Sequence, residues 1–101
     1  MSAINKPHTL ITGASEGLGK ALAIECASRG MNVILVSLPG IELFQVASHI
    51  RRRYDVSVFE YALDLSLQEN CRQLYRDIQK KNISVNMLIN NAGIGLSLIH
   101  I

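Results

Sequence analysis

The chain has 101 residues, of which 49% are hydrophobic and 18% are charged, and its formal net charge at pH 7 is +2. This length sets a ceiling of one domain, and the balance of apolar and charged residues excludes a disordered tail. The small net charge argues against a nucleic-acid or membrane-surface role. No apolar stretch approaches the roughly 20 residues that span a bilayer.

The first part of the chain alternates between a strand pattern and a helix pattern. His8–Thr12 is apolar and rich in β-branched residues, which predicts a buried strand. Gly17–Arg29 has apolar residues at helical spacing, with a basic last turn and the stop signal Gly30. Asn32–Val36 predicts a second buried strand, and Pro39-Gly40 marks the turn that follows it.

A second helix and a third strand continue this alternation. The helix ends near Tyr54 and has four apolar residues on one face, Leu43, Val46, Ala47 and Ile50. The basic run 51–53 is best explained as a solvated helix C-terminus, where cations complement the helix dipole, rather than as a binding patch. Val56–Tyr61 predicts the third strand.

Ser66 followed by Glu69 is the pattern of a capping box, so we expect the Ser66 oxygen to accept from a backbone N–H at the start of a third helix. That helix closes at residues 80–82, and Asn86–Asn90 predicts a fourth strand. Helices between consecutive strands imply right-handed crossovers and a parallel sheet. We therefore predict an α/β fold, the N-terminal half of a Rossmann doubly wound sheet, with element order β-α-β-α-β-α-β and strand order 3-2-1-4.

The loop between the first strand and the first helix, Thr12–Gly19, is rich in glycine. In this position a glycine-rich loop presents free backbone N–H groups to a phosphate, aided by the helix dipole. Gly13 permits a tight turn, Gly17 lets a pyrophosphate approach the backbone, and Gly19 lets the helix pack closely on the sheet. Alone, such a loop is also explained by a turn and a helix cap. Its place on a strand–helix unit favours phosphate binding.

Two further polar segments follow strand ends. Asp64-Leu65 comes after the third strand, and residues 90–93 (Asn-Asn-Ala-Gly) end the fourth. The carboxyl ends of parallel strands share one edge of the sheet, so Gly13, Asp64 and Asn91 face one crevice. For each segment taken alone, a simple turn is the alternative explanation.

These three ordered segments resemble the short-chain dehydrogenase/reductase family over a stretch from Thr9 to about Gly95. Thr-Gly-x-x-x-Gly-x-Gly is that family's fingerprint. The family places its aspartate, here Asp64, against the adenine, and its Asn-Asn-Ala-Gly segment beside the adenosine ribose and in support of the sheet. The resemblance implies a set of cofactor-binding residues, Gly13, Ser15, Glu16, Gly17, Leu18, Gly19, Ser37, Asp64, Leu65, Asn91, Ala92 and Gly93.

The resemblance also implies an activity for the parent protein. It would be an NAD(P)-dependent oxidoreductase that transfers a hydride between the nicotinamide and a carbonyl or alcohol carbon of a small molecule, and a homo-oligomer without nucleic-acid or membrane partners. The family's chemistry needs a Tyr-x-x-x-Lys pattern and an upstream serine. That pattern is absent from this sequence, so we assign no catalytic residue and expect the chain alone to be inactive.

Two alternatives remain. One is a non-catalytic dinucleotide-binding regulator on the same fold, which the presence or absence of downstream Ser, Tyr and Lys would distinguish. The other is a different Rossmann enzyme, such as a methyltransferase, against which the glycine fingerprint and the Asn-Asn-Ala-Gly segment argue.

The choice between NAD and NADP depends on the end of the second strand. In this family an acidic residue there pairs with the ribose hydroxyls of NAD. The matching position resembles Ser37, and without a carboxylate nothing there repels a 2′-phosphate, so NADP is favoured over NAD. Glu16 argues the other way, because members that use NADP often carry a basic residue at that position, and Leu38 is not basic either.

Cysteine usage and the N-terminus indicate a compartment. Residues 1–8 contain no apolar run typical of a signal peptide. Cys26 and Cys71 lie in predicted helices without CxxC spacing, so we expect free, buried thiols in the cytoplasm. The histidines have no metal-ligand spacing, and no metal site is predicted.

The last residues depart from the family pattern. Residues 1–95 form one partial NAD(P)-binding Rossmann domain in our interpretation, whereas Leu96–Ile101 is apolar where relatives have a polar or glycine-containing loop. These six residues can be back-translated as ctg tct ctt ata cac atc, the start of a transposon-end sequencing adaptor. We therefore expect residues 96–101 to be non-native read-through, and the fourth strand to be an edge here although it is central in a complete sheet.

Overall fold

The structure, a computed structural model, describes residues 6–92. Its elements in chain order are β1 (His8–Thr12), α1 (Gly17–Ser28), β2 (Asn32–Ser37), α2 (Ile41–Arg53), β3 (Val58–Ala62), α3 (Gln68–Lys80) and β4 (Val85–Asn90). The strands are parallel and lie in the order β3-β2-β1-β4. The α/β class, the element order and the strand order are therefore confirmed.

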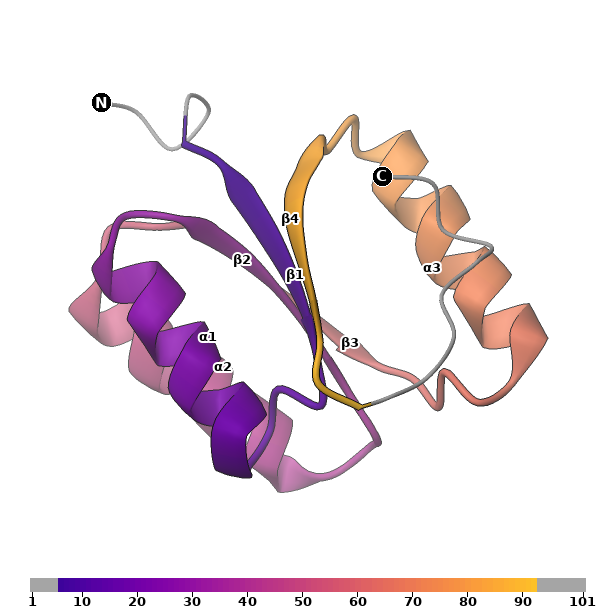
Figure 1. Ribbon diagram of the computed structural model, residues 1–101, viewed down its shortest axis with the longest axis horizontal. Helices are drawn as coiled ribbons and strands as arrows, with labels where there is room; N and C mark the ends of the chain where they lie inside the picture. Colours follow the sequence, from indigo (N-terminus) through magenta and orange to yellow (C-terminus); the bar gives the residue numbers. More distant parts are fainter. Residues whose placement is uncertain (1–5, 93–101) are drawn as a thin grey trace.

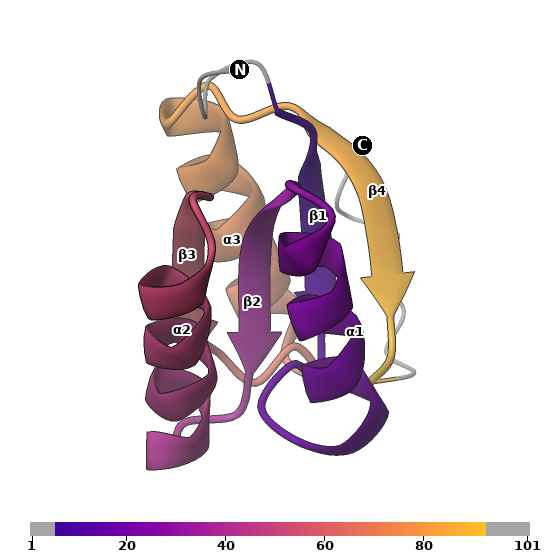
Figure 2. The same cartoon turned by 90° about the vertical axis from the view of Figure 1, so that its left-hand side faces the viewer.

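The sheet has a helical layer on each face. In Figure 1, α1 and α2 cover one face and α3 covers the other, and Figure 2 shows the four strands running in the same direction between them. Every residue of β2 is buried, and so is every residue of β1 after His8. Because side chains alternate along a strand, these two strands supply both cores. Ile11, Val33 and Leu35 pack with α1 and α2, and Leu10, Ile34 and Val36 pack with α3.

Most helix ends agree with the sequence patterns. Gly30 has a φ of +84°, a conformation that glycine adopts at little cost, so the predicted glycine stop after α1 is confirmed. Arg29 sits at the cap position, just after the last helical turn rather than within it. The basic run 51–53 forms the exposed last turn of α2. Cys26 and Cys71 are free and buried.

The predicted capping box at α3 is wrong. Leu67 occupies the cap position, and no side chain caps the helix. The Ser66 hydroxyl instead donates to the Asp64 carboxylate at 2.6 Å, and Glu69 pairs with two arginines of its own helix. α3 begins one residue later than the capping pattern requires, so Ser66 lies before the cap position, and its hydroxyl donates to the nearby ionised carboxylate.

The two outer strands are less buried than the inner pair. No residue of β3 or β4 is buried, and the Met87 side chain in β4 is 42% exposed. β3 also begins at Val58 rather than at the predicted Val56. Gly93 and the predicted read-through segment 96–101 lie outside the described residues.

Candidate functional site

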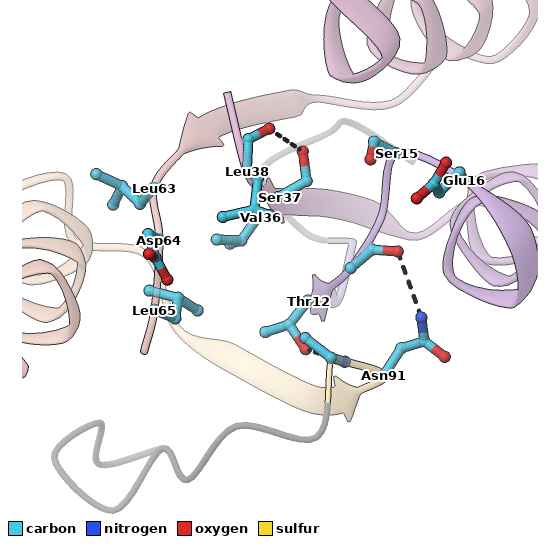
Figure 3. A pocket seen from close by; sticks show the side chains of 12 residues that line it. Thr12, Ser15, Glu16, Val36, Ser37, Leu38, Leu63, Asp64, Leu65 and Asn91 are labelled. Atoms are coloured by element: carbon cyan, nitrogen blue, oxygen red, sulfur yellow. Dashed lines mark hydrogen bonds between the residues drawn. The ribbon is translucent and has the colours of Figure 1, made fainter. Parts of the chain in front are cut away.

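A cavity of about 360 Å³ opens where the carboxyl ends of the strands meet. Figure 3 shows its walls, which come from the loop after β1, the end of β2, the segment after β3 and the segment after β4. Such a crevice at the strand ends of a doubly wound sheet is where ligands of this architecture bind. The lining residues are Thr12, Gly13, Ser15, Glu16, Val36, Ser37, Leu38, Leu63, Asp64, Leu65, Asn91 and Ala92.

Eight residues that the sequence predicts to bind a cofactor lie on this wall, namely Gly13, Ser15, Glu16, Ser37, Asp64, Leu65, Asn91 and Ala92. Gly17, Leu18 and Gly19 are in the first turn of α1 and do not line the cavity. The sequence-based prediction missed Thr12, Val36, Leu38 and Leu63. Each of these lies within or beside a predicted strand end, and this position was the signal that could have identified them.

The glycines shape the loop before α1. Gly13 and Gly17 have φ values of +63° and +57°, in the left-handed region that favours glycine. A Cβ on Gly19 would lie 1.9 Å from the Gly13 carbonyl oxygen, so the start of α1 comes close to the backbone directly after β1. A Cβ on Gly17 would meet no atom within 4 Å. The backbone at Gly17 is therefore open to a bulky group.

The start of α1 is suited to an anion. Glu16 occupies its cap position in an extended conformation, and no side chain caps the helix. The first N–H groups of a helix have no partner within the helix, and the helix dipole adds partial positive charge at that end. Together with the open backbone at Gly17, these groups can bind a phosphate or pyrophosphate.

The segment after β4 braces the glycine loop. The Thr12 hydroxyl donates to the Asn90 side-chain oxygen at 3.0 Å and accepts from the Ala92 N–H at 3.1 Å. The Asn91 side-chain amide donates to the Gly13 carbonyl at 3.4 Å, a bond drawn in Figure 3. Because these bonds join the ends of neighbouring strands β1 and β4, the loop depends on β4 for its shape.

The opposite wall combines apolar side chains with one carboxylate. Figure 3 shows Asp64 between Leu63 and Leu65, across the opening from Glu16. Hydrogen bonds from the Ser66 side chain and backbone lower the pKa of Asp64. The carboxylate is therefore ionised near neutral pH and can only accept hydrogen bonds. Apolar walls with one such acceptor fit a flat ring that carries an amine.

The end of β2 carries no negative charge. Ser37 is 6% exposed, and its hydroxyl donates to the Leu38 carbonyl at 3.1 Å. The carboxylates on the cavity wall are therefore Glu16, before α1, and Asp64, after β3. A phosphate beside β2 would meet no carboxylate from that strand, but Ser37 would have to turn from its present acceptor to donate to it.

Neither a metal cluster nor a membrane-spanning helix is found between residues 6 and 92. No group of three or more His, Cys, Asp and Glu side chains in this range is arranged to hold a metal ion. Across the same residues, every helix is too short or too polar to cross a membrane.

The sequence was compared with known families and proteins. It matches the model of the short chain dehydrogenase family over residues 7–100. It is similar to the very-long-chain 3-oxoacyl-CoA reductases of Meyerozyma guilliermondii and Mus musculus, with 38% and 34% identity over 86 residues. Each match covers 83% of this chain but 25% and 26% of those proteins. The chain thus spans about a quarter of the length of these curated relatives.

Solved structures of a reductase and a dehydrogenase are also similar to this chain. The L-sorbose reductase of Gluconobacter frateurii, in complex with NADPH and L-sorbose, has a TM-score of 0.82 at 29% identity. That match covers 92% of this chain and 35% of the other. A bulky-bulky ketone-specific alcohol dehydrogenase of Comamonas testosteroni has a TM-score of 0.78 at 34% identity, covering 90% of this chain and 37% of the other.

Proposed function

Because the chain belongs to the short-chain dehydrogenase family, we propose that it forms the cofactor-binding part of an oxidoreductase that acts on a carbonyl or alcohol substrate. The observation that carries this proposal is the cavity at the strand ends, where an open glycine loop and an uncapped helix start meet an apolar wall with one carboxylate. A dinucleotide needs these features, because it combines a pyrophosphate with a flat amino-substituted base.

The residues present fit such a cofactor in two parts. The backbone at Gly17 and the first turn of α1 would bind the pyrophosphate, and the wall formed by Leu38, Leu63 and Asp64 would bind the base. When bound, the nicotinamide supplies the hydride chemistry. The chain's own contribution is to bind and orient the cofactor. Asn91 and Ala92 brace the loop and contribute to the wall.

We further propose that the cofactor is NADP rather than NAD. The end of β2 places no carboxylate where a 2′-phosphate would be repelled. The similar L-sorbose reductase and a short-chain dehydrogenase from Sphingobium yanoikuyae were both crystallised with NADPH. The Glu16 carboxylate on the cavity wall would repel a phosphate. Replacing Glu16 therefore tests the proposal directly.

The test measures NADPH and NADH affinities of the full-length protein by fluorescence titration. We expect NADPH to bind more tightly. We expect Glu16→Gln to tighten NADPH a further ~2- to 5-fold, because one exposed charge pair is worth up to about 1 kcal/mol. Glu25→Gln, elsewhere on α1, is the matched control and should leave both affinities unchanged. Tighter binding of NADH by the wild-type protein would overturn the preference.

The parent protein's substrate and assembly are also proposals. The similar proteins carry the names of reductases and dehydrogenases, which supports a substrate with a carbonyl or alcohol group and does not favour a non-catalytic regulator. Location in the cytoplasm and homo-oligomer formation stay predictions. So does the division into residues 1–95 and a read-through segment 96–101, which the nucleotide sequence of the last codons would test.

A further inference from the structure

The start of α3 holds the Asp64 side chain from one side. The Ser66 hydroxyl donates to Asp64 Oδ1 at 2.6 Å, and the Ser66 backbone N–H donates to the same oxygen at 3.0 Å. Two donors on one carboxylate oxygen fix the rotation of the carboxylate plane. Among residues 6–92, no donor reaches the other oxygen, Oδ2.

The Asp64 backbone is held from the same segment. Its carbonyl oxygen accepts from the Asn70 side-chain amide at 2.9 Å and from the Leu67 N–H at 3.2 Å. Ser66, Leu67 and Asn70 do not line the cavity, whereas Asp64 does. These residues therefore reach the cavity only through Asp64, which they hold at both its main chain and its side chain.

We infer that Ser66 and Asn70 are positioning residues that orient the Asp64 carboxylate so that the cavity selects a 6-aminopurine over a 6-oxopurine. The inference rests on the proposed function, since it concerns the base of the proposed cofactor. It also gives a role to Ser66, whose hydroxyl does not cap α3.

Hydrogen-bond chemistry explains the selection. The exocyclic amine of adenine donates hydrogen bonds, whereas the 6-oxo group of hypoxanthine only accepts them. An ionised carboxylate has acceptors alone. With Oδ1 occupied by Ser66, the free Oδ2 can accept from the amine of a base in the adenine position but repels an oxo group there. The N1–H of hypoxanthine would reach Oδ2 only after the ring had shifted, and a carboxylate held in place by Ser66 does not follow such a shift. The lowered pKa of Asp64 keeps the carboxylate in this ionised form at neutral pH.

An amide at position 64 provides a sharper test of orientation. In Asp64→Asn, the Ser66 backbone N–H requires the amide oxygen to stay on its side, so the NH₂ group faces the cavity. The preference should then invert toward hypoxanthine, whose oxo group can accept from that NH₂.

The experiment uses the full-length protein with NADPH and its hypoxanthine analogue, reduced nicotinamide hypoxanthine dinucleotide phosphate. We measure the ratio of their dissociation constants, which cancels any loss of folded protein in a variant. We expect the wild type to prefer NADPH by ~10-fold or more, the value of one hydrogen bond to a charged group. Ser66→Ala should lower this ratio at least ~3-fold, and Asn70→Ala should lower it less. Ser66→Thr, which keeps the hydroxyl, and Ser48→Ala, a control on α2, should keep the ratio.

The outcomes distinguish failure of the proposed cofactor binding from failure of the proposed positioning role. If the wild type binds neither nucleotide, the proposed function is overturned. If it binds NADPH but Ser66→Ala keeps the wild-type ratio within ~2-fold, the positioning role alone is overturned. An Asp64→Asn variant that keeps the wild-type preference for NADPH would also overturn it. A ratio that falls in Ser66→Ala and is kept in Ser66→Thr supports it.

Discussion

The two outer strands of the sheet differ in how their open sides are protected. At β3, the Arg51 side chain reaches from α2 to the Glu60 carboxylate and to the Val58 carbonyl oxygen, which it meets at 2.7 Å. On the opposite face, Lys81 lies over the Tyr61 ring, 5.7 Å from its centroid. Charged side chains along an edge strand discourage pairing with another strand.

β4 has no such protection. None of its residues is buried, Met87 is 42% exposed, and no ion pair between residues 6 and 92 involves a β4 side chain. β3 thus resembles an edge strand protected by charged side chains, whereas β4 has no charged residue and resembles an interior strand. Since the relatives are more than three times as long as this chain, we expect a further strand to pair with β4 in the full-length protein.

The largest expected effect concerns the 101-residue chain on its own. Its unprotected β4 and the small proportion of surface that a short chain can bury should leave it marginally stable or aggregated. Size-exclusion chromatography and thermal unfolding measure this directly. A monomer with a reversible, cooperative transition would show that β4 is stable as an edge strand. It would contradict the proposed difference between β3 and β4.

The next effect compares one substitution at each edge of the full-length protein. Met87→Lys should lower the free energy of unfolding by ~2–3 kcal/mol, because a strand paired with β4 would bury this side chain. Ala62→Lys, at the exposed end of β3, should cost less than ~0.5 kcal/mol. Urea unfolding measures both. Equal small costs would mean that β4 remains an edge in the full-length protein.

A smaller effect is expected from the protection of β3 itself. Arg51→Ala removes the contacts with Glu60 and with the Val58 carbonyl and should cost ~1 kcal/mol in urea unfolding. Arg53→Ala, on the same exposed helix turn, is the matched control and should change stability by less than ~0.5 kcal/mol. If both variants behave alike, the Arg51 contacts contribute little to this edge.

The smallest effect is a dependence on pH beside β3. Lys81 donates to Asp77 at 2.6 Å and Tyr61 donates to the same oxygen, and these bonds, Lys81 first, lower the pKa of Asp77 below its ordinary 3.8. A lowered carboxyl pKa gives stability that is present above the unfolded-state value and is lost as the pH falls through the folded-state value. Asp77→Asn should therefore flatten the decline of the urea midpoint below about pH 4. Lys81→Met should flatten it too, and an unchanged slope in both variants would contradict this.

Much of the fold could be predicted from the sequence because its local signals agree with one another. The apolar runs of β1 and β2, the glycine stop at Gly30 and the polar residues after each strand all indicate the same parallel arrangement. The walls of the cavity followed from this, since Gly13, Asp64 and Asn91 sit just after strand ends.

The remaining features of the fold and the site could not be predicted, because they depend on contacts that form only in the folded chain. Ser66 fits a capping box, but α3 begins one residue later than that pattern requires, and the Ser66 hydroxyl donates to the Asp64 carboxylate. Leu38 and Leu63 line the cavity, and only their position beside a strand end, not their apolar type, separates them from core residues. The sequence predicts close packing at Gly19 but not its nearest neighbour, the Gly13 carbonyl, which only the folded loop brings near.

The bonds between Thr12 and Asn90 and between Gly13 and Asn91 each join residues 78 positions apart. The glycine loop is synthesised well before Asn90 and Asn91, which follow only after three helices and three further strands have been made. Contacts of such long sequence separation form slowly, because the intervening chain must first be ordered. During synthesis, the glycine loop should therefore acquire its shape late, so a nascent chain that has not yet placed β4 lacks the complete cavity in which we propose that a nucleotide binds.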